Sequence, residues 1–366
     1  MPPKETSSQT APTAMSLRDK YAKFDNIDTS DDDDDWAAQA AKSASREAEK
    51  LAKLSVEERA EMEKHLEPWK PAAPSPYTGG TSKGPGSRET SPLSIALQFG
   101  KQTAGIFTIV RDEPIFLALW YKHYSRQFAN KDMHVLVHVT SEAEQPVGPF
   151  ADALKQFDAE NVVRLVNAEY DQVWLNEVVA NKTREMLRSY AVVLFAEADE
   201  FLTVPPDVYG PHTLADYIFN FAGDAGKPAV RCKGYEIHHD TFAGEGPLDP
   251  SKPILEQRKR WHRNTLYDKA LLTKVPLKWS LGFHTCEEKV EQDEKLLLVH
   301  LHKYDFPKYL ERHEARAKFV HSESSVANGY QAHYRKTGKE LVTQYMDTPS
   351  PIEDVPEWLC ERLEGI

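Results

Sequence analysis

Cysteine is scarce in this sequence of 366 residues, and its three cysteines, Cys232, Cys286 and Cys360, lack the paired spacing of a zinc site. An odd number of cysteines also argues against the disulfide framework that stabilises many small secreted domains. The first thirty residues contain no apolar core of a secretory signal. We therefore expect a cytoplasmic protein with free thiols.

Long apolar runs and basic stripes are lacking too. No stretch approaches the roughly 18 apolar residues of a membrane-spanning helix, so we expect no transmembrane segment. Lys and Arg total 45 against 57 Asp and Glu, a formal net charge of -12, and seven of these acids lie between residues 25 and 35. Because nucleic acids are bound mainly by Lys and Arg clustered on one face, this balance argues against a nucleic-acid partner.

The chain before residue 93 divides into three segments by composition. Residues 1–35 are polar and end in five aspartates, which predicts a disordered acidic tail. Residues 36–67 are rich in helix-forming Ala, Glu, Lys and Arg, which predicts a helical extension. Residues 68–92 hold six prolines and four glycines and form a predicted linker. Thr29 and Ser30 precede the aspartates, a context for an acidophilic kinase, but we favour a solubilising acidic tail as the explanation.

After residue 93, short apolar runs alternate with helical stretches. This alternation is typical of an α/β domain with a mostly parallel sheet and helices on both faces. We assign residues 93–322 to this domain and residues 323–366 to a C-terminal helical segment that includes a polar helix at 325–346. The expected strands are 105–110, 133–140, 162–166, 191–196, 229–238, 269–274 and 295–302, and the expected helices of the first half are 114–128 and 172–190. In the second helix, the expected core positions are Val173, Trp174, Val178 and Leu187.

Three acids, Glu197, Asp199 and Glu200, follow the fourth predicted strand. In α/β domains ligands bind beyond the carboxyl ends of the strands, so this position favours function. Glu197 and Asp199 are two residues apart and would share one face of an extended chain. Paired carboxylates repel each other unless a cation intervenes, and Mn²⁺ or Mg²⁺ would answer that need. The alternative is that the acids begin an exposed turn.

The run at residues 198–202, Ala-Asp-Glu-Phe-Leu, resembles the D-x-D-E-F-L signature of GT-A glycosyltransferases of the family 2-like group. Residues 106–124 resemble the opening strand, N-E dipeptide and following helix of that group. Lys269 and residues 281–285 resemble its lysine strand and G-x-H-x segment. The correspondence runs in order from about residue 105 to residue 319. It implies a GT-A (Rossmann-like) fold and transfer of a sugar from a nucleotide-sugar donor to an unknown acceptor.

The resemblance also implies roles for individual residues. The metal ligands would be Glu197, Asp199 and His284, although Glu197 stands where the family usually has Asp. His300 and His302, two residues apart on a predicted strand, are a rival source of the histidine ligand. The implied donor-binding residues are Arg111, Glu113, Asn181, Lys182 and Lys269, with Asn181 and Lys182 equally well explained as solvent-facing helix residues.

Transfer with inversion would need a carboxylate near the acceptor hydroxyl, and Asp240 and Glu200 are the candidate catalytic residues. The acid that the family places after the second strand is missing, so the donor nucleotide stays open.

Two other functions remain open from the sequence. A metal-dependent phosphoester hydrolase would use acids and histidines to activate water. A non-catalytic adaptor with a nucleotide-sugar fold would act through the N-terminal segments, and the departure at Glu197 is compatible with it.

Overall fold

The computed structural model describes residues 102–206, 213–241, 245–327, 334 and 336–366. The predicted tail, extension and linker, with Thr29 and Ser30, lie outside the described residues. The chain divides into two compact units; residues 336–344 belong to one, and the other described residues belong to the second, on which the following paragraphs concentrate. None of the helices in these ranges combines the length and apolarity needed to traverse a bilayer.

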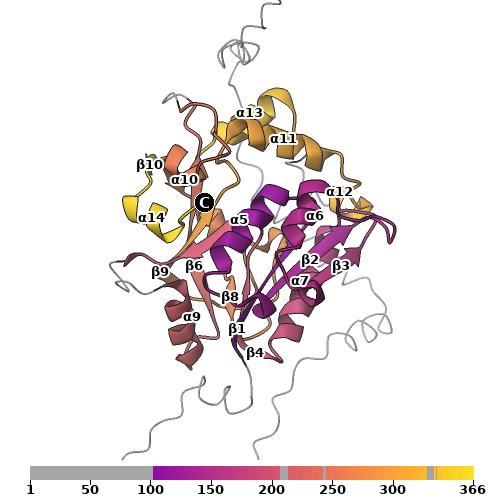
Figure 1. Cartoon of the computed structure of the whole chain (residues 1–366), viewed down its shortest axis with the longest axis vertical. Helices are drawn as coiled ribbons and strands as arrows, with labels where there is room; N and C mark the ends of the chain where they lie inside the picture. Colours follow the sequence, from indigo (N-terminus) through magenta and orange to yellow (C-terminus); the bar gives the residue numbers. More distant parts are fainter. Residues whose placement is uncertain (1–101, 207–212, 242–244, 328–333, 335) are drawn as a thin grey trace, which may run out of the picture. The chain divides into compact units, whose positions relative to one another are not determined.

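Ten strands in the described ranges form one sheet, with the main order β10-β7-β6-β8-β4-β1-β2-β3. Four neighbouring strands are parallel, and they match predicted strands within three residues at each end. They are β1 (Gln102–Val110), β2 (Met133–Val139), β3 (Val162–Val166) and β4 (Tyr190–Phe195). The mixed α/β fold with a mostly parallel centre is therefore confirmed (Figure 1).

The second half of the sheet is mixed in direction. β8 (Leu272–Thr273) runs antiparallel to both β4 and β6 (Ala229–His238), and it is shorter than the predicted strand at 269–274. β9 (Gln292–His300) pairs parallel with β6 and antiparallel with β5 (Glu200–Thr203). The edge is completed by β7 (Arg260–Arg263) and β10 (Ile352–Asp354). Since Glu200 pairs opposite His300, the sheet itself brings the acid cluster beside the histidine pair.

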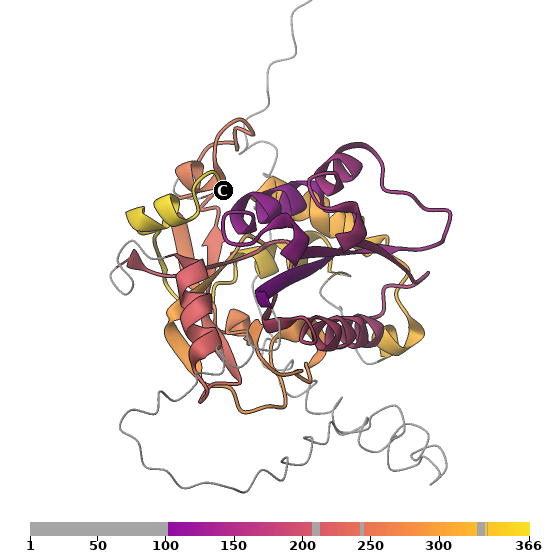
Figure 2. The ribbon, with the colours of Figure 1, turned by 60° about the horizontal axis from the view of Figure 1, so that its bottom comes forward.

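Helices cover both faces of the parallel strands: α5 (Pro114–Tyr124) and α6 (Gly148–Leu154) lie on one face and α7 (Gln172–Met186) on the other (Figure 2). The α7 helix starts where the Asp171 carboxylate accepts a hydrogen bond from the Trp174 N–H at 2.9 Å. The predicted core positions of α7 are right in part, since three of the four pack against the core and Val173 is exposed. Leu175, Val179 and Met186 are buried, while Val173 is 38 % exposed and Trp174, Val178 and Leu187 are only partly buried.

The helix α11 (Phe306–Ala317) matters most for the site. The Asp305 carboxylate accepts the Lys308 N–H at 3.1 Å at its start, and Pro307 stands in its first turn. The polar helix predicted at 325–346 is instead two helices, α12 (Glu323–Ala327) and α13 (Gly338–Met346), and strand β10 also lies in the segment predicted as helical. The other α-helices of the described ranges are α9 (Leu214–Gly223), α10 (Ile254–Gln257) and α14 (Glu357–Arg362).

Candidate metal centre and adjacent cavity

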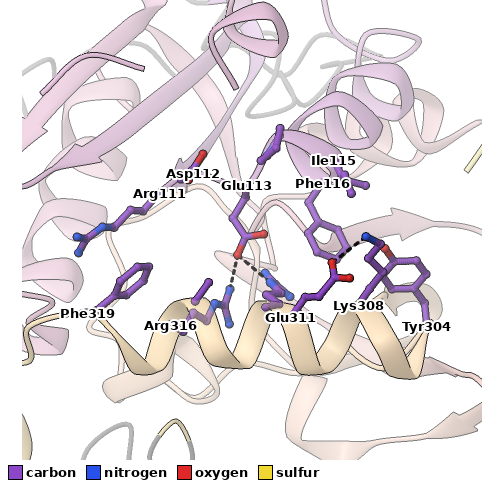
Figure 3. Close-up of a pocket in the computed structure, with 13 residues that line it drawn as sticks. Arg111, Asp112, Glu113, Ile115, Phe116, Tyr304, Lys308, Glu311, Arg316 and Phe319 are labelled. Carbon is purple, nitrogen blue, oxygen red and sulfur yellow. Dashed lines mark hydrogen bonds and ion pairs between the residues drawn. The ribbon is translucent and has the colours of Figure 1, made fainter. Parts of the chain in front are cut away.

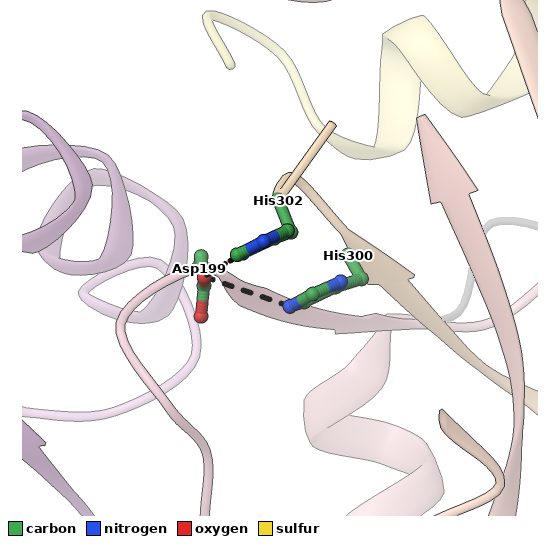
Figure 4. Close-up of side chains that lie close together, drawn as sticks. All are labelled: Asp199, His300 and His302. Atoms are coloured by element: carbon green, nitrogen blue, oxygen red, sulfur yellow. Dashed lines mark ion pairs between the residues drawn. The ribbon is translucent and has the colours of Figure 1, made fainter. Parts of the chain in front are cut away.

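Asp199, His300 and His302 meet where the β4–β5 turn packs against the end of β9. The Leu301 N–H donates to the Asp199 carbonyl at 3.0 Å, which fixes the turn on the strand. The Asp199 Oδ2 lies 3.5 Å from His300 Nε2 and 4.0 Å from His302 Nδ1 (Figure 4). One ligand atom from each residue lies within 4.8 Å of the others, so the three side chains can converge on one metal ion.

His300 is oriented by a carboxylate on its other side. Its Nδ1 lies 3.1 Å from Oε1 of the buried Glu236, so its Nε2 is directed toward Asp199. Burial disfavours the charged imidazole, but Asp199 and Glu236 together raise the pKa of His300 to about 9. The ring of His302 stacks on that of His300, with centroids 5.6 Å apart. The two rings therefore present nitrogen atoms on the same side, although β9 ends at His300 and His302 lies in the turn that follows, not on the predicted strand.

Asp199 and His302 also contact Arg312, which enters from α11. Its Nη1 lies 2.5 Å from Asp199 Oδ2 and donates to His302 Nδ1 at 3.3 Å. Although burial opposes ionisation, Arg312 and His300 hold the pKa of the Asp199 carboxyl well below its usual range. Burial and the Arg312 and His300 charges hold the pKa of His302 well below its usual value, so its imidazole is neutral.

Glu197 and Glu200 are not on the metal side but share Lys269. The Lys269 Nζ lies 2.6 Å from Glu197 Oε2 and 2.5 Å from Glu200 Oε1, and its side chain is 1 % exposed. Burial raises the pKa of Glu200. Burial also opposes the charge of Lys269, but the two carboxylates raise the pKa of its ammonium group.

The expectation that Glu197 and Asp199 share one face is therefore corrected. β4 ends at Phe195 and β5 begins at Glu200, so the acids lie in a turn, closed by the Glu200 N–H donating to the Glu197 carbonyl at 3.0 Å. Strand alternation does not apply there, and Glu197 meets Glu200 at Lys269 instead.

A cavity of about 230 Å³ opens between the end of β1 and α11. Glu113 Oε1 lies at its centre, 2.7 Å from Arg312 Nε and 3.0 Å from Arg316 Nη2 (Figure 3). The Arg111 guanidinium stacks 4.0 Å from the Phe319 ring centroid, and its Nη1 is buried without a hydrogen-bond partner in the described part of the chain. Asp112, which stands between Arg111 and Glu113, has a φ of 49°, a left-handed conformation that marks a sharp turn after β1.

The remaining predicted site residues are outside the convergent set of Asp199, His300 and His302, although His284 lies near enough to exchange electrostatic effects with Glu197, Lys269 and His300. The His284 Nδ1–H donates a hydrogen bond to the Leu266 carbonyl at 2.8 Å, and the His284 ring lies 6.0 Å from that of Tyr267. Burial, reinforced by Lys269, lowers the pKa of His284 to about 4. The Asp240 N–H donates to Glu245 Oε2 at 3.0 Å in the loop after β6.

Lys182 and Asn181 are not at the site. Lys182 forms an ion pair with Glu185 at 2.8 Å. Burial, reinforced by the charge of Lys182, lowers the pKa of His134 to about 4, and His134 stands at the start of β2. That is the amino end of the parallel strands, whereas Asp199 and the cavity lie beyond their carboxyl ends. Asn181, its exposed neighbour on α7, shares that placement.

The sequence reasoning missed Arg312, Arg316 and Glu236. A signal for the arginines existed, because Lys308, Arg312 and Arg316 recur every four residues and so share one helix face. Glu236 had no such signal, since its role depends on the pairing of β6 with β9.

The donor set fits a divalent ion. One carboxylate and two imidazoles form a mixed oxygen and nitrogen set of the kind that Mn²⁺ or Zn²⁺ accepts. The hydrogen bond from His300 to Glu236 is the outer support that metal-bound histidines usually have. The neutral His302 offers a lone pair, whereas His300 would release a proton on binding.

Neither a protein-family model nor a curated protein sequence matches this chain. Among solved structures, S. aureus TarS is similar at 10% identity over 67% of this chain and 42% of its own, with a TM-score of 0.30. The chain thus spans less than half the length of that protein. The structure of S. aureus TarS 1-349 gives 10% identity, 61% and 68% coverage and a TM-score of 0.27. The mannosyltransferase PcManGT from Pyrobaculum calidifontis, in complex with GDP-Man and Mn²⁺, gives 12% identity, 69% and 66% coverage and a TM-score of 0.28.

Proposed function

We propose that this protein is a metal-dependent glycosyltransferase that moves a sugar from a nucleotide-sugar donor to an acceptor hydroxyl. One observation carries the proposal: Asp199, His300 and His302 converge beyond the carboxyl ends of the strands, next to a cavity lined by arginines. This is where α/β domains bind ligands. The resemblance of residues 198–202 and 106–124 to GT-A signatures supports the choice of reaction.

The cavity suits an anionic donor group. A bound Mn²⁺ or Mg²⁺ would neutralise the charge that a donor diphosphate develops as the sugar leaves. Arg111 presents a buried N–H that has no partner among the described residues, and Arg312 and Arg316 line the same cavity. Glu113 forms ion pairs with Arg312 and Arg316, so we assign it the role of positioning these two arginines.

The roles of the other predicted residues follow from their contacts. Lys269 forms ion pairs with Glu197 and Glu200 and holds them close to the turn that carries Asp199. In our proposal these three residues shape the turn, and the metal is bound by Asp199, His300 and His302, with His284 outside this set. We propose that Asp240 is the base that accepts the proton of the acceptor hydroxyl. The acceptor would be a glycan, a protein or a small molecule in the cytoplasm. Asn181 and Lys182 have no part in the proposal.

A thermal-shift panel tests this function. UDP-, GDP- and CDP-sugars are compared with and without Mn²⁺, in the wild type, in Asp199→Asn and in Asp152→Asn. Asp152 is a matched control because its carboxylate is exposed and pairs with Lys155 on the surface. A ligand at 100 times its dissociation constant stabilises the folded state by about 2.7 kcal/mol, which is several degrees in a domain of this size.

We expect one nucleotide to stabilise the wild type and Asp152→Asn only when Mn²⁺ is present, and Asp199→Asn not to respond. No response to any donor would contradict the proposal and favour the adaptor. Hydrolysis of generic phosphoesters without sugar transfer would favour the hydrolase.

A further inference from the structure

Arg312 is a buried cation held on three sides. Its Nη1 lies 2.5 Å from Asp199 Oδ2 and 3.3 Å from His302 Nδ1. Its Nε lies 2.7 Å from Glu113 Oε1, and its guanidinium carbon stands 4.3 Å from the centroid of the Phe116 ring. The side chain is 11 % exposed. Arg312 therefore occupies a defined position among the proposed metal ligands.

This position conflicts with a metal ion bound by the same atoms. A neutral imidazole nitrogen has a single lone pair, so His302 Nδ1 can accept the N–H of Arg312 or coordinate a metal, but not both. A metal at the usual distance of about 2.1 Å from that nitrogen would stand next to the guanidinium. Two adjacent positive centres in a buried site repel each other strongly.

We infer that Arg312 is an internal cation that competes with the metal: it closes the ligand set of the metal-free protein and leaves His302 Nδ1 when a divalent ion binds. The inference rests on the proposed function only in requiring a metal at this site. Glu113 provides the second anchor, since it keeps hold of Arg312 through Nε while Nη1 is displaced.

The competition couples the metal to anions in the cavity. Arg312 lines the cavity, so an anion bound there can accept its displaced N–H. Such an anion would draw Arg312 away from Asp199 and His302 and strengthen metal binding, and the metal would strengthen anion binding by the same factor. Arg312 would thus make binding of metal and of the donor diphosphate interdependent.

Calorimetric titration with MnCl₂ alone tests the competition. Arg312→Gln is expected to bind Mn²⁺ at least tenfold more tightly than the wild type, because the competing charge is gone. The matched control is Arg316→Gln. Arg316 also contacts Glu113, at 3.0 Å, and stands four residues along the same helix, but it donates hydrogen bonds to Glu113 and Tyr334 and not to Asp199 or His302 among the described residues. We expect its affinity to stay within threefold of that of the wild type.

The outcomes separate this inference from the proposed function. Equal Mn²⁺ affinity in Arg312→Gln and the wild type would overturn the competition and leave the metal site standing. No binding to either protein would overturn both. A gain as large in Arg316→Gln as in Arg312→Gln would also overturn it, because any loss of positive charge would then suffice.

A second measurement on the wild type guards against misfolding of Arg312→Gln. The arginine Nε–H resonances of the ¹⁵N-labelled protein are followed during titration with Zn²⁺, which is diamagnetic and suits the imidazole ligands, with the Arg312 signal assigned from Arg312→Lys. We expect the Arg312 signal to shift with metal occupancy. A bound metal that leaves this signal unchanged would overturn the inference.

Discussion

Replacing Lys269 with methionine should destabilise the fold more than any ordinary surface change. Lys269 is 1 % exposed and lies between Glu197 and Glu200. Its removal leaves Glu200, which is fully buried, without a neutralising partner, whereas Glu197 is 37 % exposed and keeps part of its hydration. Breaking a buried ion pair from one side costs about 3–5 kcal/mol, so we expect a fall in Tm of roughly 6–20 °C.

The pH dependence of this loss identifies its cause. Burial already raises the pKa of Glu200, and without Lys269 that pKa rises further. The folded variant then holds a proton that the unfolded chain releases above a pKa of about 4.3, so the deficit grows as the pH rises. Between pH 5.5 and 7.5 it should grow by up to about 2.7 kcal/mol if Glu200 stays protonated throughout.

Urea unfolding at these two pH values measures the effect, with Lys278→Met as the matched control. Lys278 pairs with Glu287 at 3.3 Å, but both side chains are more than 70 % exposed, so its loss should cost less than about 1 kcal/mol. The double variant Lys269→Met with Glu200→Gln should recover much of the stability. Equal losses in Lys269→Met and Lys278→Met, or a deficit that does not change with pH, would refute this reasoning.

Two further predictions concern the frame around the site. Gly234→Ala should lower the free energy of unfolding by about 1–3 kcal/mol, because the added Cβ would stand 2.6 Å from the Tyr267 backbone carbon. Urea unfolding measures this loss, and Gly223→Ala is the control because a Cβ added there has nothing within 4 Å. The pKa of His300 is raised from 6.5 to about 9 in the folded state, so its charge stabilises the fold fully only below pH 6.5. In EDTA, the free energy of unfolding should therefore fall by about 3 kcal/mol as the pH rises from 6.5 through 9. His300→Gln should flatten this slope, and an unchanged slope would contradict the role of His300.

The parallel strands were predictable because each is a mostly apolar run, although His134 and His138 interrupt β2 and Arg164 interrupts β3. The acid cluster was predictable because its three acids stand between an apolar strand and further apolar residues. The core face of α7 was not, because Val173, Trp174, Leu175, Val178 and Val179 give apolar residues on more than one face. Only packing selects among these faces.

Local patterns did not show which cation balances which acid, although the spacing of Arg312 and Arg316 places both on one helix face. Lys269 lies 72 positions after Glu197 in the chain, and Arg312 lies 113 positions after Asp199. The need for positive charge near the cluster was correctly predicted from repulsion between carboxylates. That the chain supplies these cations itself depends on tertiary contacts, which no residue spacing encodes.

The opposition of Glu200 and His300 on β5 and β9 makes the site sensitive to alignment of these two strands. Side chains alternate along a strand, so a slip of one residue would turn the imidazole of His300 to the opposite surface of the sheet. A single-residue insertion between Val299 and His300 should therefore turn His300 away from Asp199 and abolish the centre while leaving most of the core intact. The centre can form only when this ladder is in register.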